Sequence, residues 1–418
     1  MRSVDRSSSD RICCRLICVS AIVILLLCLI SCNNPTQPQT VADPVIWPPS
    51  GHYSEDPTVL ITCATTDAQI RYTLDGSDPG PQSPIYQEPF LVHIGTHLRV
   101  VASKEGLKDS NIVSAFFMGT LPWNIGRCDT PGTAYAVTIR DGIAYVADGT
   151  SGLVCVSTTD PTAPVITGMC DTPGEARAID VVGDYAYLAG SSGDLRVINV
   201  SNPYSPYLSG YCNAEDIVQG ICVIGGYAYV ACSDAGLGII NVSDPSQPFT
   251  AGFCAGLGYA VDLAVLGSYA YLIIQNESLL VLDIRDPENP YLVGSCSIDG
   301  ACHVYAEGSY AYVAAGDNGM QIIDIGDPTA PGLIGSCDRA EGAVSVTVKG
   351  EMACVARGDQ GIVVLDVKDP SLPFIISSSM TAHSAMDVDL SGNYAYVADA
   401  QKGLSIFQLE YTAKQEIR

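Results

Sequence analysis

Seven variable residues occupy one position in successive copies of an internal repeat, and several of them are polar. Each lies seven residues beyond a cysteine or, in the last copy, beyond Ser379; in order they are Tyr135, Arg177, Gln219, Val261, His303, Val344 and Met386. A small residue recurs just before most of them, so this position varies where its neighbours repeat. We therefore predict that Tyr135, Arg177, Gln219 and His303 form a polar, ligand-facing arc. The alternative is that they are ordinary lining residues over trapped water.

The place of His303 in this arc depends on a one-residue gap. The fifth copy has lost one residue between Cys296 and Gly308. If the loss falls after His303, this histidine belongs to the variable position. Counted back from the turn at Gly308, Cys302 takes its place.

The five histidines are scattered, and no acid and base residues show the spacing of a recognisable catalytic centre. Asp262 and Asp387 share one position of the repeat, and Asp180 and Asp389 share another two residues on, but neither pair falls in neighbouring copies. A glycosidase needs its two carboxylates within about 5 to 9.5 Å of each other. The turn-based alignment would set His303 in the copy next to Asp262, which is the best pairing of an acid with a histidine. The sequence contains no HExxH, GxSxG or GxxxxGK(S/T) motif, so we assign no catalytic residue and no cofactor.

The 17 cysteines do not indicate a disulfide framework or a metal site. Five lie within the first 32 residues, and six occupy one equivalent position: Cys128, Cys170, Cys212, Cys254, Cys296 and Cys337. Equivalent positions in neighbouring units should be further apart than the Cα separation of about 7 Å that a disulfide allows. We expect small buried thiols at the ends of strands, and the absence of C-x-x-C spacing gives zinc or redox chemistry little support.

These residues are positioned by a repeat of 42 residues, with one step of 41. Its marker is Ala-Tyr-(Val/Leu), whose tyrosine falls at 145, 187, 229, 271, 312 and 396, with Cys354 in the sixth copy. Each copy holds four apolar segments divided by turn residues such as Gly225-Gly226, which is the pattern of a propeller blade. The sequence therefore predicts an all-β fold with a seven-bladed β-propeller, in which the repeated tyrosines pack in the core and the variable residues lie near one mouth of a central channel.

The ends of the array predict how the ring closes. The last copy stops after residues 404–409 and lacks a fourth strand, whereas residues 121–128 align with the fourth strand of the next copy and have no first three strands before them. We expect this N-terminal segment to be the outer strand of the last blade, which leaves no unpaired sheet edge.

At this point the chain resembles the LVIVD-repeat β-propellers of bacterial and archaeal cell-surface proteins. The resemblance rests on Gly-(Leu/Ile)-x-(Val/Ile)-(Val/Ile/Leu)-(Asp/Asn)-(Val/Ile)-x-Asp-Pro, seen at residues 236–245 and 361–370. It implies a propeller over residues 119–410, followed by a tail at 411–418. The resemblance implies a fold and does not imply a reaction.

A second resemblance covers residues 45–118. The series Pro48-Pro49-Ser50-Gly51-His52-Tyr53, residues 70–79, residues 83–86 and residues 98–102 is similar to the β-sandwich accessory module at the C-terminal end of chitobiases and β-hexosaminidases. Alternating apolar and polar residues at 69–74 and 96–102 support strands independently. The resemblance implies a small Ig/fibronectin-like β-sandwich and transfers no catalytic residue.

The N-terminus carries a targeting signal. Four arginines precede an apolar run that ends in Leu29-Ile30-Ser31-Cys32, and this sequence resembles the lipobox of bacterial lipoproteins. We predict a signal peptide at residues 1–31, lipidation of Cys32 and a tether at residues 32–44. The alternative is an uncleaved transmembrane helix, for which the run is short.

Charge and targeting together bound the function. The formal net charge is −25, and removal of residues 1–31, with four arginines and two aspartates, makes it −27. Such a surface repels nucleic acid. We expect a monomeric, non-catalytic cell-envelope lipoprotein, facing the periplasm or the exterior, that binds a protein or a glycan and reaches the membrane through its lipid anchor. The alternative is an extracytoplasmic enzyme, a hydrolase or lyase acting on polysaccharide.

Overall fold

The computed structural model describes residues 40–53, 56–93, 95–119 and 123–409. Their first part is a β-sandwich of two sheets. One sheet has the order β1-β3-β5 and the other β2-β7-β6-β4. The strands are β1 (Val45–Trp47), β2 (Gly51–Tyr53), β3 (Thr58–Thr62), β4 (Gln69–Thr73), β5 (Phe90–Leu91), β6 (His97–Ser103) and β7 (Val113–Gly119). Alternate residues of β6 are buried, and Leu98, Val100 and Ala102 pack with Val59 and Phe117 in the sandwich core.

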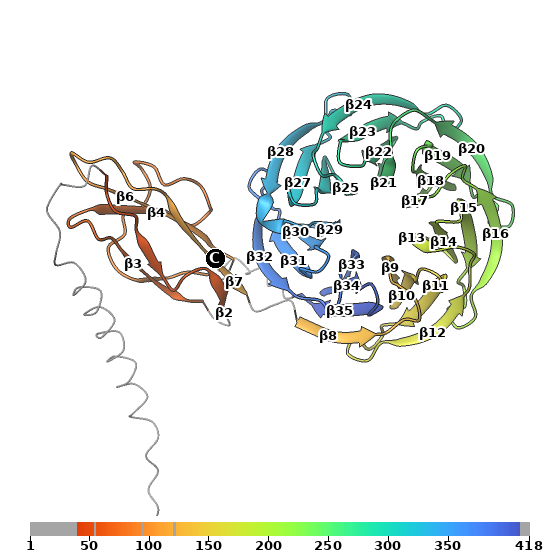
Figure 1. The fold of residues 1–418 in the computed structure, drawn as a ribbon, viewed down its shortest axis with the longest axis horizontal. Helices are drawn as coiled ribbons and strands as arrows, with labels where there is room; N and C mark the ends of the chain where they lie inside the picture. The colour runs from red at the N-terminus through yellow and green to blue at the C-terminus, as the bar shows by residue number, and fades with distance from the viewer. Residues whose placement is uncertain (1–39, 54–55, 94, 120–122, 410–418) are drawn as a thin grey trace, which may run out of the picture.

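The rest of the chain forms seven four-stranded antiparallel sheets around one axis (Figure 1). The first strand of each blade lies innermost: β9 (Ala136–Arg140), β13 (Ala176–Val182), β17 (Gly220–Ile224), β21 (Ala260–Leu266), β25 (His303–Glu307), β29 (Ser345–Lys349) and β33 (Asp387–Ser391). The second strands are β10 (Ile143–Ala147), β14 (Tyr185–Gly190), β18 (Tyr227–Cys232), β22 (Tyr269–Ile274), β26 (Tyr310–Ala314), β30 (Met352–Ala356) and β34 (Tyr394–Ala398).

The third strands and the outer strands complete the blades. The third strands are β11 (Leu153–Ser157), β15 (Asp194–Asn199), β19 (Gly236–Asn241), β23 (Ser278–Asp283), β27 (Met320–Asp324), β31 (Ile362–Asp366) and β35 (Leu404–Gln408). The outer strands are β12 (Val165–Cys170), β16 (Tyr207–Asn213), β20 (Phe249–Cys254), β24 (Tyr291–Ser297), β28 (Gly332–Cys337), β32 (Phe374–Ser379) and β8 (Trp123–Cys128). A single described 3-10 turn, η1 (Asp338–Ala340), follows β28.

The N-terminal strand β8 closes the ring. It pairs antiparallel with β35, so that Leu404 lies opposite Cys128 and Gln408 opposite Trp123. Figure 1 shows β8 at the outer rim beside the last three strands of the chain. The prediction of seven blades and of an N-terminal outer strand is confirmed, although residues 121 and 122 lie outside the described part of the chain.

The repeated tyrosines are core residues, as the sequence predicted. The six tyrosines of the marker are 2–6% exposed and Cys354 is fully buried. The two-residue turn at Gly225-Gly226 has φ of +60° and +82°, values that favour glycine in a primed hairpin turn. One expectation was wrong: of the six equivalent cysteines, which all lie on outermost strands, five are half-buried and only Cys337, directly before the 3-10 turn η1, is buried. All cysteines in the described residues are free thiols.

A glycine two residues before each of these cysteines lets neighbouring blades touch. A Cβ built on Gly252 of β20 would lie 2.0 Å from the Pro287 carbonyl oxygen, in the Asp-Pro turn of the next blade. Gly126, Gly168, Gly210, Gly294 and Gly335 meet the corresponding proline carbonyls at 2.0–2.5 Å. The exception is Ser377 of β32, whose next blade is the last one and carries no Asp-Pro turn. Glycine is therefore required only where such a turn packs on the strand.

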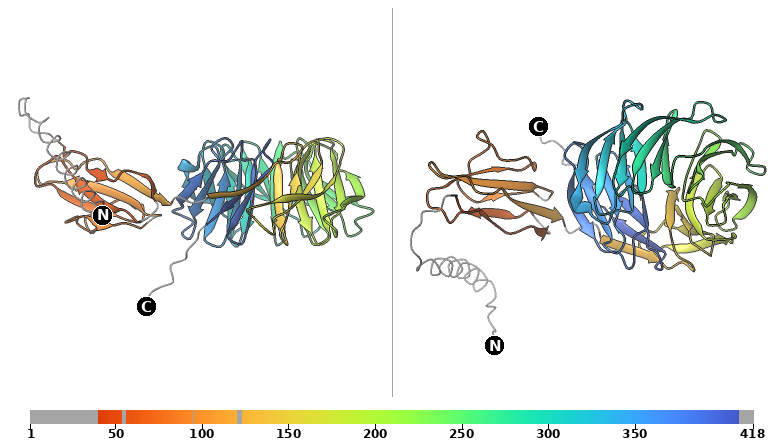
Figure 2. Two further views of the ribbon diagram at one scale, coloured as in Figure 1. Left: turned by 90° about the horizontal axis from the view of Figure 1, so that it is seen from below. Right: turned by 45° about the horizontal axis from the view of Figure 1, so that its top comes forward.

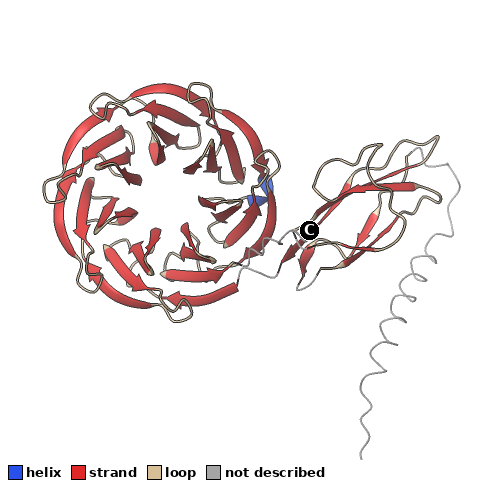
Figure 3. Ribbon diagram, turned by 180° about the vertical axis from the view of Figure 1, so that it is seen from behind, coloured by secondary structure: helices blue, strands red, loops and turns tan. Residues whose placement is uncertain are grey.

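The sandwich lies against one side of the propeller. Figure 2 shows the sandwich beside the edge of the propeller disc, and Figure 3 places the short 3-10 turn η1 on the side of the disc that faces it. Strand β7 contacts β32, and the Phe116 and Phe374 rings meet edge to face at 6.2 Å between centroids. Within the described residues no helix is both long and apolar enough to cross a membrane. The predicted signal peptide at residues 1–31 and Cys32 lie outside those residues.

The close contact at Gly252 predicts that the same Gly-to-Ala substitution changes stability differently at two positions of the outer strands. Gly252→Ala should lower the stability of the propeller by about 1–3 kcal/mol, because the methyl group must displace backbone atoms. Gly332→Ala, on the outer strand β28, should leave it nearly unchanged, because no atom lies within 4 Å of the added Cβ. Urea unfolding followed by circular dichroism measures both. Equal midpoints for the two variants would contradict this account of the contact.

Candidate binding site around the propeller axis

The hydrogen bonds of blade 5 decide which residue takes the variable position. The Cys302 amide donates to the Ala314 carbonyl at 2.9 Å, as the Tyr135 amide does to Ala147 in blade 1. The one-residue loss therefore falls in the loop between Cys296 and Ala301, before β25. Cys302 belongs with Tyr135, Arg177 and Gln219, and the assignment of His303 to that position is wrong.

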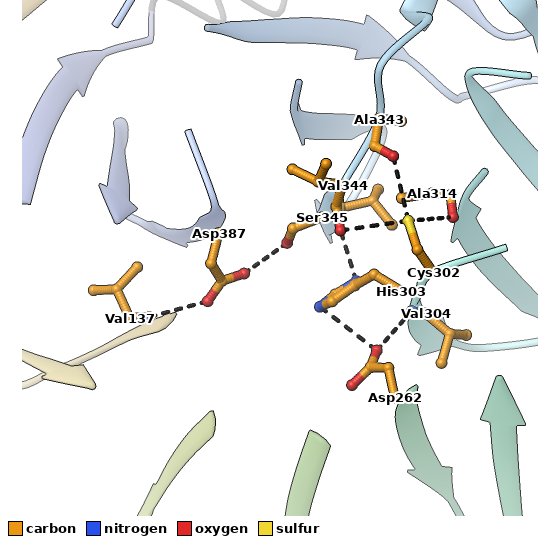
Figure 4. Close-up of polar contacts among 11 residues, drawn as sticks. Val137, Asp262, Cys302, His303, Val304, Ala314, Ala343, Val344, Ser345 and Asp387 are labelled. Carbon is orange, nitrogen blue, oxygen red and sulfur yellow. Dashed lines mark hydrogen bonds and ion pairs between the residues drawn. The ribbon is translucent and has the colours of Figure 1, made fainter. Parts of the chain in front are cut away.

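His303 lies one residue further along its strand, at the register of three other polar residues. It pairs with Ala314, as Asp262 pairs with Ile273, Ser345 with Ala356 and Asp387 with Ala398. The four side chains lie in consecutive blades, from the fourth to the seventh. Figure 4 shows them facing a common centre. We call Asp262, His303, Ser345 and Asp387 the axial arc.

The other predicted binding residues, Tyr135, Arg177 and Gln219, form two separate contacts. We call these three, together with Glu175 and Tyr259, the mouth residues. The Arg177 guanidinium lies over the Tyr135 ring at 5.6 Å from its centroid, and Arg177 Nη2 donates to Glu175 Oε2 at 2.8 Å. Gln219 Nε2 donates to the Tyr259 hydroxyl at 3.2 Å. The structure thus brings Tyr135 and Arg177 together, whereas Gln219 and His303 have other partners.

The mouth residues are accessible. The Arg177 and Glu175 side chains are 37% and 39% exposed, Tyr259 is 37% exposed, and Tyr135 and Gln219 are half-buried. They present a guanidinium, a carboxylate, an amide and two phenol groups on neighbouring blades. Such a set can donate, accept and stack, which is recognition chemistry.

The aspartates of the inner strands cap backbone amides of the next blade. Asp262 Oδ2 accepts from the Val304 amide at 2.8 Å, and Asp387 Oδ2 accepts from the Val137 amide at 3.0 Å. Two residues further along their strands, Asp180 accepts from Val223 at 2.7 Å and Asp389 from Ile139 at 2.8 Å. An innermost strand has a sheet partner on one side only, so its other edge needs acceptors. The repeated acids therefore serve as edge caps.

His303 performs the same capping role with a nitrogen acceptor. Its Nδ1 accepts from the Val346 amide at 3.3 Å, which assigns the proton of the neutral ring to Nε2. Nε2 lies 3.7 Å from Asp262 Oδ2, beyond hydrogen-bond distance. Ser345 Oγ donates to Asp387 Oδ1 at 2.6 Å (Figure 4). The predicted acid and histidine are neighbours, and each is held by a backbone amide.

Burial shifts the titration of several groups near the axis. Burial is the largest cause of the raised pKa of Asp262, and the charge of His303 partly offsets it. Burial also raises the pKa of Asp389 to about 6, assisted by repulsion from Asp387 and Asp180. The Cys302 thiol donates to the Ala314 and Ala343 carbonyls, and burial raises its pKa to about 11, so at neutral pH it is a thiol rather than a nucleophilic thiolate. No three His, Cys, Asp or Glu side chains in the described residues are placed to hold a metal ion.

Sequence reasoning missed Glu175 and Tyr259 because it followed a single position of the repeat. Glu175 lies two residues before Arg177, and Tyr259 two residues before Val261. Comparing residues on both sides of the variable position could have found them, since neither type recurs there in most copies.

Comparison with family models agrees with this architecture. The LVIVD repeat model matches residues 131–172, 173–214, 217–255, 257–298, 300–339, 342–381 and 382–407, well over half of the chain. The chain belongs to the LVIVD-repeat family. In this LVIVD-repeat protein, residues 48–114 match the chitobiase/beta-hexosaminidase C-terminal domain, which confirms the second resemblance. No curated protein matches the chain.

Two solved structures resemble this LVIVD-repeat protein in fold. The WD40 β-propeller domain of Doa1 has a TM-score of 0.56 at 11% identity, covering 70% of this chain and 97% of that chain. The computationally designed Ika8 protein has a TM-score of 0.51 at 9% identity, covering 78% of this chain and 94% of that chain. At such identities the likeness concerns the fold alone.

The raised pKa of Asp389 predicts a pH-dependent stability in this LVIVD-repeat protein. Because the folded pKa of about 6 lies above that of an unfolded aspartate, near 3.9, the stabilisation is complete below about pH 4 and is lost as the pH rises through 6. Asp389→Asn should remove this pH-dependent loss, although its single oxygen can replace only one of the two carboxylate oxygens that accept the Ile139 and Leu390 amides, at a cost that does not depend on pH. The thermal midpoint of the variant should therefore rise relative to that of the wild type as the pH increases from 5 to 7.5. Parallel profiles in differential scanning calorimetry would contradict the assignment.

Proposed function

We propose that this protein is a non-catalytic cell-envelope lipoprotein whose propeller is a binding scaffold for a protein or a glycan. The observation that carries the proposal is the contrast between two sets of polar residues. The axial acids and His303 are engaged in capping backbone amides, whereas Tyr135, Arg177, Gln219 and their partners remain accessible on neighbouring blades. The mouth residues are thus available to a ligand, and the sandwich serves as a spacer between the propeller and a lipid-modified Cys32.

The runner-up is an extracytoplasmic enzyme that acts on polysaccharide. Asp262 and His303 favour it, because a buried carboxyl of raised pKa beside an imidazole is a feature of many catalytic sites. Against it, both groups accept backbone amide protons that would be left unpaired if the side chains turned to a substrate. Occurrence of a similar accessory domain in sugar hydrolases is a likeness of fold and carries no reaction.

Binding should depend on the mouth residues. We expect a glycan array probed with residues 33–418, which retain the buried Val41 of the sandwich core, to give a saturable signal. Arg177→Ala should weaken it at least about tenfold, the loss expected for one charge-assisted hydrogen bond. Arg140→Ala is the matched control, because Arg140 is similarly exposed, 42% against 37%, but lies at the opposite end of its inner strand.

The outcomes separate the two functions. Equal binding by the Arg177→Ala variant, by His303→Gln and by the Arg140→Ala control would refute recognition at the mouth. Release of reducing ends from a bound glycan by the wild type, abolished by His303→Gln, would favour the enzyme. An array without a hit directs the search to a protein partner, by crosslinking in intact envelopes and comparison of the same variants.

The lipid anchor has its own test. When the full chain is expressed in bacteria, Cys32→Ser should move the protein from the membrane pellet to the soluble or secreted fraction and abolish labelling with a radioactive fatty acid. Cys28→Ser, four residues earlier in the apolar run, is the matched control and should leave both unchanged. Membrane retention of the Cys32→Ser protein would instead favour an uncleaved transmembrane helix.

A further inference from the structure

A pocket of about 440 Å³ lies between the sandwich and blades 5 and 6 of the propeller. It is lined by β6 and β7 residues of the sandwich and by residues of β28, η1, β31 and β32 of the propeller. Its volume falls within the range of small-molecule sites in proteins. The pocket is separate from the mouth and axial residues, which lie on the inner strands or just before them.

The charge of this pocket is opposite to that of the protein. Arg339 and Arg357 line it, and Asp338 is the only acid among its lining residues. His97 lines it too, but burial and the charge of Arg339 lower the pKa of its imidazole, so the two arginines carry the positive charge. The whole chain, by contrast, carries 45 acidic residues against 20 lysines and arginines. Two guanidinium groups from nearby segments of the propeller and one imidazole from the sandwich therefore converge on one small volume.

Arg357 stands at a position that varies among the blades and is occupied elsewhere by Asp148, Gly190, Cys232, Ile274, Ala315 and Asp399. Its amide donates to Gly361 O, as the amides of Asp148 and Asp399 donate to Gly152 and Gly403 in blades 1 and 7. Both aspartates are fully buried, and each accepts a hydrogen bond from the segment that precedes the inner strand of its blade: Asp148 from the Gly132 amide and Asp399 from the His383 amide. Blade 6, the blade that faces the sandwich, thus places a cation where two other blades place a carboxylate.

The Arg357 guanidinium is not satisfied by the protein. Its Nη2 donates to the Gln360 carbonyl at 3.2 Å, and its Nε is buried without a hydrogen-bond partner. Neither Arg357 nor Arg339 forms an ion pair with a carboxylate of the described residues. Burial lowers the pKa of Arg357 in spite of the charge of Glu341. A buried donor without an acceptor is costly, and an anion in the pocket would remove that cost.

The remaining walls are apolar and aromatic. Phe116 of the sandwich and Phe374 of β32 meet edge to face, and Val363, Pro373 and Ile375 line the pocket beside them. The His97 ring packs on Phe116 at 5.5 Å between centroids. A ligand that fills this space presents the face of a ring to the phenyl groups and an anionic group to the arginines.

We propose that this pocket binds a small carboxylate carried on a six-membered ring. A guanidinium offers the planar pair of donors that a carboxylate accepts, and the phenyl rings cover the face of the ligand ring. The ring is either aromatic, as in benzoate, or a sugar, as in glucuronate. A ligand held in this way contacts both domains. This site stands apart from the proposed function and would exist even if the mouth residues bound nothing.

The test uses two acids and their neutral counterparts on residues 33–418. Ligand-observed NMR should detect binding of benzoate or glucuronate, and of neither benzamide nor glucose. Arg339→Gln and Arg357→Gln should each weaken the binding at least about tenfold. Arg127→Gln is the charge-matched control, because Arg127 is exposed and pairs with Asp129 away from the pocket. Preference for benzoate or for glucuronate identifies the kind of ring.

Two results would overturn the proposal. One is equal signals from each acid and its neutral counterpart, or no signal from either acid. The other is the same loss of binding in Arg127→Gln as in the two pocket variants, which would indicate a diffuse effect of charge. Thermal unfolding of each variant checks the fold, and Arg339, whose side chain is exposed, provides a variant that should fold normally if Arg357→Gln does not.

Discussion

The close contact between the outer strand of one blade and the Asp-Pro turn of the next is the constraint on which the rest of the propeller depends. A carbonyl oxygen about 2 Å from where a Cβ would stand leaves no room for a side chain. Each outer strand that meets such a turn must therefore carry glycine at the point of contact. This contact links each blade to the next except blade 6 to blade 7. It is absent only at Ser377, where the last blade supplies no such turn and the ring is closed instead by pairing of β8 with β35.

Closure of the ring creates a second requirement at its centre. Seven innermost strands each leave one edge without a strand partner, and their amides face the axis. Side chains from the preceding blade supply the acceptors: aspartate in four places and the His303 imidazole in one. This explains why acids recur at two positions of the repeat without falling in the geometry of a catalytic pair. The raised pKa values of Asp262 and Asp389 follow from the same placement, since a carboxylate that caps a strand edge must lie away from bulk water.

The fold could be predicted from the sequence because repetition carries it. The tyrosine marker gave the number of blades, and the unpaired segment before Cys128 gave the closing strand. The register of blade 5 could not be settled, since a one-residue loss between Cys296 and Gly308 fits the sequence in several places. The hydrogen bonds of Cys302 decide it. The expectation that the cysteines of the outer strands are buried was also wrong for five of the six. A repeated position indicates a shared environment but does not show how far that environment is from solvent.

The pocket beside Arg357 lay beyond the reach of sequence comparison for a related reason. In a repeat protein, a residue that departs from its copies reports a demand that the other blades do not share, but the sequence does not show what makes the demand. Ser377 departs because its neighbouring turn is missing. Arg357 and the 3-10 turn η1 lie in or next to blade 6, whose outer strand β32 contacts the sandwich. Both place arginines toward the same space, and packing alone would have favoured apolar contacts there, as at Phe116 and Phe374. A cation kept in such a place without a carboxylate partner in the described residues is best explained by an anion that comes from outside the chain.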